Sequence, residues 1–128
     1  MVIDTSALAA VLFDEPERDE VIGKIAAAPR RLISSATLLE ASIVIESRRG
    51  DAAGRELDLL LHRAKVQTVA VDEAQVELAR AAWRRYGKGR HPAGLNFGDL
   101  FAYALARAGG DALLFKGDDF ARTDITAA

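Results

Sequence analysis

Hydrophobic positions along the chain fall into short continuous runs and longer stretches with a helical period. Apolar runs of roughly four to eight residues are typical of strands buried on both faces, and apolar residues three or four positions apart are typical of amphipathic helices. The runs predict strands at residues 1–4, 31–34, 66–71 and 111–117. The periodic stretches predict helices at residues 6–13, 16–28, 36–50, 51–64, 72–87 and 97–108.

The ends of the predicted helices coincide with residues that cap or stop helices. Asp4, Thr5 or Ser6 can cap the first helix, and Asp72 can cap the helix after the third strand. Gly50 can end the long helix in the first half of the chain. Because buried strands alternate with helices, we expect an α/β/α sandwich with helices on both faces of a central parallel sheet of about four to five strands.

Length and composition limit the classes of protein that this chain can be. Its 128 residues show no repeat and no linker, so we expect one domain over residues 1–128. The 17 basic and 19 acidic residues give a net charge of −2, which excludes a global electrostatic attraction to nucleic acid. No apolar run is long enough to span a membrane, and no basic segment precedes the first strand, so we expect no signal peptide.

The chain contains no cysteine. Disulfides and thiolate metal sites are therefore excluded, and a reducing cytoplasm is the expected compartment. Any metal site must be built from oxygen or histidine ligands.

Three aspartates follow the ends of two predicted strands. Asp4 ends the first strand, and Asp118 and Asp119 follow the fourth. In an open parallel sheet, ligands bind just beyond the carboxyl ends of the strands. These aspartates therefore belong to the sheet edge at which we expect chemistry.

Two further acids lie on predicted helices beside apolar residues. Glu40 has Ala36, Ile43 and Val44 as its neighbours one helical turn away. We therefore expect Glu40 to lie within the buried apolar stripe, whereas Glu46 faces outward. A buried carboxylate is costly unless it has a partner, and no lysine or arginine lies near Glu40 except at the far end of the helix.

Asp99 lies at about the third position of the last long helix if Asn96 is its cap. Ala102 and Tyr103 follow it by three and four positions, which places Asp99 on the face that looks toward the core. An acid at this place needs either a structural role or a ligand.

Each acid also has a purely structural interpretation. Asp4 could serve only as an N-cap, and Asp99 could form a capping pair with Asn96. Glu40 could pair with a distant arginine. One of the two aspartates after the fourth strand could start a turn before a short last helix.

Together the acids predict a metal site. Carboxylates that converge on one sheet edge repel one another and raise each other's pKa unless a cation holds them. Oxygen ligands without histidine or cysteine select Mg²⁺ or Mn²⁺. Such an ion activates a water and neutralises charge on a transferring phosphoryl group. We therefore expect Mg²⁺, with Mn²⁺ as a second possibility, and hydrolysis of a phosphodiester.

Four segments carry a resemblance to a known family: MVIDTSALAAVL, LLEASIVIE, GLNFGDLFAYALA and LLFKGDDFARTDI. They resemble the PIN domain, and within it the VapC toxins of bacterial VapBC toxin–antitoxin pairs, over nearly the whole chain. The resemblance implies a Mg²⁺-dependent endoribonuclease that a cognate VapB-type antitoxin holds inactive. It also implies a homodimer, and a heterotetramer or larger complex with the antitoxin.

The resemblance implies roles for individual residues as well. Asp4, Glu40 and Asp99 correspond to the first three family acids, with Asp4 and Asp99 as the main metal ligands. Glu40 would bind the metal through water or help to deprotonate the nucleophile. The fourth acid falls in the Asp118–Asp119 pair, and Asp119, directly before a phenylalanine, fits better. The supporting residues that the resemblance implies are Thr5, Ser6, Asn96 and Asp118.

Basic residues cluster shortly before Asp99 and beside the last acids. Because an acidic pocket repels RNA, phosphate contacts must lie near it. Trp83 or Tyr86 could stack on a base, or could belong to the core or a dimer interface. A solvated surface would carry the same charges, so that interpretation stays open for the basic cluster. The predicted RNA contacts are Arg84, Arg85, Lys88, Arg90, His91 and Lys116.

Two other functions fit the same sequence. One is a metal-dependent nuclease that processes RNA or DNA without acting as a toxin. The other is a non-catalytic PIN interaction module, although a scaffold has no need to gather acids that repel one another.

Overall fold

Four parallel strands form the centre of the protein, in the order β3–β2–β1–β4. The computed structural model describes all residues from Met1 to Ala128. Val2 of the central strand lies opposite Leu32 on one side and Leu113 on the other. The predicted parallel sheet of about four to five strands is confirmed, and it has four. The strands are β1 (Val2–Ile3), β2 (Leu32–Ser34), β3 (Gln67–Val69) and β4 (Leu113–Leu114).

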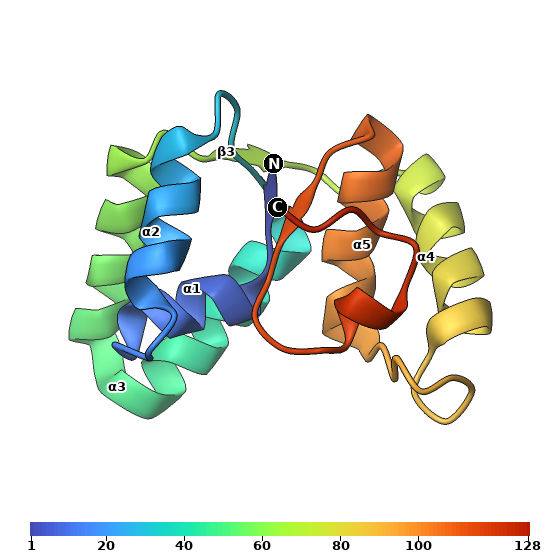
Figure 1. Cartoon of the computed structure of the whole chain (residues 1–128). Coiled ribbons are helices and arrows are strands. Elements are labelled where there is room, and N and C mark those ends of the chain that lie inside the picture. The colour runs from blue at the N-terminus through green and yellow to red at the C-terminus, as the bar shows by residue number, and fades with distance from the viewer.

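Helices cover both faces of this sheet (Figure 1). The first three helices pack together on one face, and the next two pack together on the other. The predicted α/β/α sandwich is therefore confirmed. The helices are α1 (Thr5–Leu12), α2 (Arg18–Ala27), α3 (Ser35–Arg63), α4 (Glu73–Tyr86) and α5 (Phe97–Gly109), followed by the 3₁₀ helix η1 (Phe120–Arg122).

Alternation along the short strands divides the core into two clusters. Val2 and Leu113 face α4 and α5, whereas Ile3 and Leu114 face α1, α2 and α3. Successive side chains of a strand point to opposite faces, so β1, β2 and β4 each supply both layers. This is why these three strands read as continuous apolar runs, whereas Gln67 and Thr68 of the edge strand β3 are exposed.

The strands are shorter than those predicted from the apolar runs. The run at 111–117 gives a strand of only Leu113–Leu114, because the chain leaves the sheet after the bond from Asp4 N–H to Leu114 O. The next polar backbone contact, from Lys116 N–H, goes to the Ser6 side chain instead of a strand. The end of β4 is therefore tied to the start of α1.

Gly50 divides the long third helix, as its sequence position predicts. Its φ of 76° lies in the left-handed region and interrupts the helical geometry inside α3. The predicted helices at 36–50 and 51–64 are thus two arms of one bent element. The second arm packs toward α1 and α2, which lie beside it in Figure 1.

No helix combines the length and the hydropathy that crossing a membrane would require.

Candidate active site

Asp4 links the end of β1 to the start of α1. It is 3% exposed and caps α1, because its Oδ2 accepts hydrogen bonds from Ser6 N–H at 3.0 Å and from Ser6 Oγ at 2.6 Å. Its other oxygen, Oδ1, is buried and has no hydrogen-bond partner. The cap therefore uses only half of the carboxylate, and a buried anionic oxygen without a partner is costly.

Ser6 fixes the orientation of that carboxylate. The Ser6 hydroxyl accepts a hydrogen bond from Lys116 N–H at 2.9 Å, so its proton is directed to Asp4 Oδ2. Oδ1 is consequently the oxygen left for a ligand.

Glu40 is held by Thr5, which lies between Asp4 and Ser6 in the chain. Thr5 Oγ1 donates a hydrogen bond of 2.5 Å to Glu40 Oε1. The other oxygen, Oε2, lies over Gly98 at the start of α5, where a Cβ atom would overlap it. Glu40 therefore pairs with a hydroxyl, not with the distant arginine that a structural role would need.

The prediction that Glu40 lies within the buried stripe of its helix is wrong. The buried stripe of this arm consists of Thr37, Ala41 and Ile45, whereas Ile43 is 57% exposed. Glu40 is on the border of that stripe, between the core and solvent. The prediction put the stripe in the wrong place because it treated exposed apolar residues of this helix, such as Ile43, as buried ones.

Asp99 and Asn96 form the capping box that the structural interpretation predicts. Asn96 Oδ1 accepts from Asp99 N–H at 3.0 Å, and Asp99 Oδ2 accepts from Asn96 N–H at 2.9 Å. As at Asp4, the cap uses one carboxylate oxygen, so capping leaves Asp99 Oδ1 available to a ligand.

Neighbouring acids act electrostatically on Asp99 and Asp4. Burial raises the pKa of Asp99 from 3.8 to about 6, the hydrogen bond from Asn96 opposes the rise, and the charges of Asp4, Asp119 and Glu40 add to it. Burial also raises the pKa of Asp4, against the two hydrogen bonds from Ser6, and the Glu40 charge raises it further. The structure thus brings together Asp4, Glu40, Asp99 and Asp119.

Of the adjacent pair Asp118 and Asp119, only Asp119 is among the charges that raise the pKa of Asp99 most. Asp119 directly precedes η1 as its N-cap residue, and its side chain makes no capping hydrogen bond. The structure thus favours Asp119 as the fourth acid, through its effect on Asp99.

The donor set fits a hard divalent cation. No three acidic, histidine or cysteine side chains already lie close enough to ligate one ion. However, the partnerless Asp4 Oδ1 and the mutual repulsion felt by Asp99 are both relieved by a cation between them. Carboxylate oxygens without nitrogen or sulfur ligands fit Mg²⁺ or Mn²⁺.

The predicted RNA-binding residues lie on the end of α4 and on the following loop. Arg84, Arg85, Lys88 and Arg90 are exposed. The Arg90 guanidinium lies 4.4 Å from the centre of the Trp83 ring, and Arg85 contacts Asp124 at 3.9 Å. These cations are accessible to a phosphate.

Three other predicted or considered residues have internal partners. His91 Nδ1 accepts from Ala93 N–H at 3.0 Å, and its ring packs edge-on against Tyr86. Tyr86 is 5% exposed, which places it in the core as one of its two interpretations predicts. The ammonium of Lys116 contacts the carboxylates of Glu15 and Glu17.

Comparison with known proteins identifies the family. The model of the family described as "PIN domain" matches residues 1–125. The chain belongs to the PIN-domain family. The resemblance seen in the sequence motifs is confirmed.

Named relatives of this PIN domain are ribonucleases. "Ribonuclease VapC" of Mycolicibacterium smegmatis is 60% identical over 127 residues, covering 99% of this chain and 98% of the relative. "Ribonuclease VapC30" of Mycobacterium tuberculosis is 58% identical over 125 residues, covering 98% and 95%.

Solved structures share the PIN fold at lower identity. The crystal structure of Mycobacterium tuberculosis VapC20, described as a Sarcin-Ricin loop cleaving toxin, has a TM-score of 0.81 at 20% identity and covers 99% of this chain and 97% of that one. A toxin–antitoxin complex from Klebsiella pneumoniae has a TM-score of 0.74 at 17% identity and covers 99% and 95%. At these identities the likeness shows the fold.

The contacts of three residues, Gly98, Glu15 and Glu17, were not predicted from the sequence. Gly98 permits the approach of Glu40 to α5. A glycine in the first turn of a capped helix could have indicated such a close contact. Glu15 and Glu17 receive the Lys116 ammonium from about a hundred residues away. No local pattern announces a contact between such distant positions.

Proposed function

We propose that this PIN-domain protein is a Mg²⁺-dependent endoribonuclease toxin that hydrolyses RNA phosphodiester bonds and is neutralised by a VapB-type antitoxin. The observation that carries the proposal is the buried, partnerless Oδ1 of Asp4, together with the charges of Asp4, Asp119 and Glu40 that act on Asp99. The ribonuclease names of relatives at 58–60% identity support it. A chain without cysteine that acts on cellular RNA fits the cytoplasm, and we propose that compartment.

Asp4 and Asp99 would hold the ion, each through the oxygen that its cap leaves available. A divalent ion at this place supplies an activated water and neutralises charge on the phosphoryl group. Ser6 keeps Oδ1 of Asp4 directed to the ligand by occupying Oδ2. Asp119 completes the acidic pocket from the segment that follows β4.

Glu40 would serve as the general base. Thr5 occupies its Oε1, which leaves Oε2 to accept a proton from the attacking water. Burial is the main cause of the raised pKa of Asp99, and a bound cation would offset the charges of Asp4, Asp119 and Glu40 that add to it.

The exposed arginines and lysine that end α4 and begin the next loop would bind the RNA backbone. They lie shortly before Asn96 in the chain, and Asn96 caps the helix that carries Asp99. Their contacts with phosphates would make binding weaker as the salt concentration rises. The proposed contacts are Arg84, Arg85, Lys88, Arg90 and His91.

Cleavage of total cellular RNA by purified, antitoxin-free protein tests the proposed function. We expect discrete fragments with Mg²⁺ and none with EDTA, and sequencing the fragment ends would identify the target. Single-stranded and double-stranded DNA serve as parallel substrates. Cleavage of DNA in place of RNA, or no cleavage by folded protein at millimolar Mg²⁺, would contradict it.

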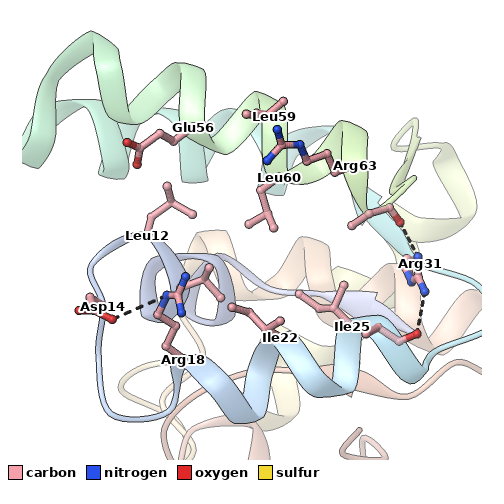
Figure 2. A pocket seen from close by; sticks show the side chains of 13 residues that line it. Leu12, Asp14, Arg18, Ile22, Ile25, Arg31, Glu56, Leu59, Leu60 and Arg63 are labelled. Atoms are coloured by element: carbon pink, nitrogen blue, oxygen red, sulfur yellow. Dashed lines mark hydrogen bonds and ion pairs between the residues drawn. The ribbon is translucent and has the colours of Figure 1, made fainter.

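A groove on the face covered by α1, α2 and α3 is lined by none of the four candidate site acids and suits an antitoxin segment. It has a volume of about 900 Å³ and lies between α1–α2 and the second arm of α3. Figure 2 shows Leu12, Ile22 and Leu60 directed into it, with Arg18 and Arg63 at its rim. An apolar floor with charged edges fits an amphipathic helix, and we propose that the antitoxin binds here.

Leu59 offers a test of this groove, because it lines the groove and is 45% exposed. We expect Leu59→Asp to weaken antitoxin binding by roughly tenfold or more, since a hot-spot side chain contributes about 2 kcal/mol. Cleavage by the free variant should equal that of the parent protein. Val76→Asp is the matched control, because Val76 is similarly exposed but lies on α4. Calorimetric titration with the antitoxin gives the affinities, and equal affinities for both variants would exclude the groove.

The proposed homodimer would use another apolar surface. Leu39, Ile43 and Phe97 are exposed, Phe97 by 78%, and the contact of Glu40 with Gly98 places them around one junction of α3 and α5. A second copy covering these side chains would remove them from water. Sedimentation should show a dimer that Phe97→Glu dissociates, and a monomer at all concentrations would contradict this arrangement.

A further inference from the structure

Lys116 joins three segments of the chain at the edge of the acidic pocket. Its ammonium contacts Glu15 and lies 3.2 Å from Glu17 Oε2, both in the turn between α1 and α2. Its backbone N–H donates to Ser6 Oγ at 2.9 Å, and Ser6 in turn bonds Asp4. One residue thus connects the end of β4 to both ends of α1.

The segment held in this way carries Asp119. It runs from Phe115 to the start of η1 and turns at Gly117, whose φ of 100° lies in the left-handed region. At its far end the buried Phe120 ring packs 5.2 Å from the Phe115 ring. The Asp119 carboxylate has no capping bond of its own, so the backbone around it must set its position.

We propose that Lys116 is a positioning residue: its ion pairs with Glu15 and Glu17 hold the 115–119 segment so that Asp119 and Asp4 face the same pocket. This inference rests on the proposed function, because it assigns to Lys116 a part in the same site. It replaces the phosphate contact that the sequence suggested for this lysine.

The geometry favours positioning over RNA binding. The Lys116 side chain is only 31% exposed and already has two carboxylate partners. An RNA phosphate would have to displace both of them. An isolated surface ion pair contributes little, but one ammonium shared by two carboxylates forms a network. Pro16, between the two glutamates, restricts the backbone of the turn that presents them.

Lys116→Met removes the ammonium and keeps the backbone N–H that bonds Ser6. In metal-free protein we expect hydrogen–deuterium exchange over residues 115–120 to become about tenfold faster, because local opening loses its ionic restraint. RNA cleavage should fall roughly 10- to 100-fold, as for a small misplacement of a catalytic group. The salt dependence of RNA binding should stay the same.

In a Glu17→Gln background, which removes the second carboxylate, the charge-reversed pair Glu15→Lys with Lys116→Glu should restore both slow exchange and cleavage, whereas each single reversal should not. If Lys116 only stabilised the fold, variants of equal thermal stability would cleave RNA equally well. Cleavage would then not depend on whether positions 15 and 116 carry opposite charges. If Lys116→Met does not fold, the double variant Glu15→Gln with Glu17→Gln, which leaves Lys116 in place, must show the same two changes.

Unchanged exchange in Lys116→Met, or no rescue by the reversed pair, would overturn the proposal. A loss of affinity for RNA with a weaker salt dependence would instead assign Lys116 to phosphate binding and would also overturn it. Exchange is measured without metal or RNA, so it reports on the positioning even if the parent protein cleaves no RNA. Failure of the proposed function and failure of this inference are therefore distinguishable.

Discussion

Asp99→Asn is expected to reduce RNA cleavage about a thousandfold while leaving the protein folded, because ligation of a catalytic cation contributes several kcal/mol. Asparagine keeps an oxygen that can accept the hydrogen bond from Asn96 N–H, and the backbone N–H of residue 99 is unaffected. The capping box can therefore survive, but the negative charge that a cation requires is lost. Single-turnover cleavage at saturating Mg²⁺ measures the effect.

The stability of the same variant separates a catalytic from a structural carboxylate. The pKa of Asp99 is raised to about 6 in the folded protein, chiefly by burial and also by neighbouring charges, from 3.8. A raised pKa stabilises the fold below about pH 4, and this contribution is lost as the pH rises through 6.

The free energy of unfolding of the metal-free parent protein should therefore fall as the pH rises from about 4 to about 6. Asp99→Asn should remove the contribution of Asp99 to this pH dependence. At pH 7.5 we expect the free energy of unfolding of the variant to equal that of the parent or to exceed it by up to roughly 1–2 kcal/mol, because solvent screening reduces the effect. Urea unfolding in EDTA at several pH values gives the comparison. A variant clearly less stable than the parent at pH 7.5 would show that Asp99 serves the fold.

The second large effect is expected at Gly98. A methyl group there would overlap Glu40 Oε2, so Gly98→Ala must push the Glu40 carboxylate away from α5. The displaced atoms end a flexible side chain, and alanine is a better helix former than glycine, so stability should be unchanged or slightly higher. Cleavage should fall roughly 10- to 100-fold, because Glu40, the proposed general base, is misplaced.

Gly23→Ala is the matched control for this variant. Gly23 lies within α2, and a Cβ there would meet no atom within 4 Å. It should gain the same kind of helix stabilisation with parent-like cleavage. Thermal melts and cleavage rates for both variants decide the matter. If Gly98→Ala cleaved RNA as fast as Gly23→Ala, Glu40 would not act at the place where it lies.

Much of the fold could be predicted from local patterns in the sequence. The apolar runs located the four strands, and Ser34, Asp72 and Asn96 cap the helices that follow them, as their side chains allow. Gly50 marks a real break, because its left-handed φ suits glycine. These features depend on residues close together in the chain, which is why one sequence was sufficient.

The candidate site was only partly predictable. Asp4 follows from the strand-end rule and Asp99 from its place in a capped helix, and the structure brings both together. The position of Glu40 was misjudged, because exposed apolar residues such as Ile43 imitate a buried stripe. The ion pairs of Lys116 with two glutamates join distant parts of the chain, so no local spacing could reveal them.

The central claim is that the carboxylates around Asp4 Oδ1 bind a divalent cation. Titration of metal-free protein with Mn²⁺, followed by the electron paramagnetic resonance of the free ion, tests it directly, with Asp4→Asn as the control. We predict that the parent protein binds Mn²⁺, that Mg²⁺ displaces it, and that Asp4→Asn binds far less. Equal binding by the two proteins, or none by folded parent protein at millimolar Mn²⁺, would contradict the claim.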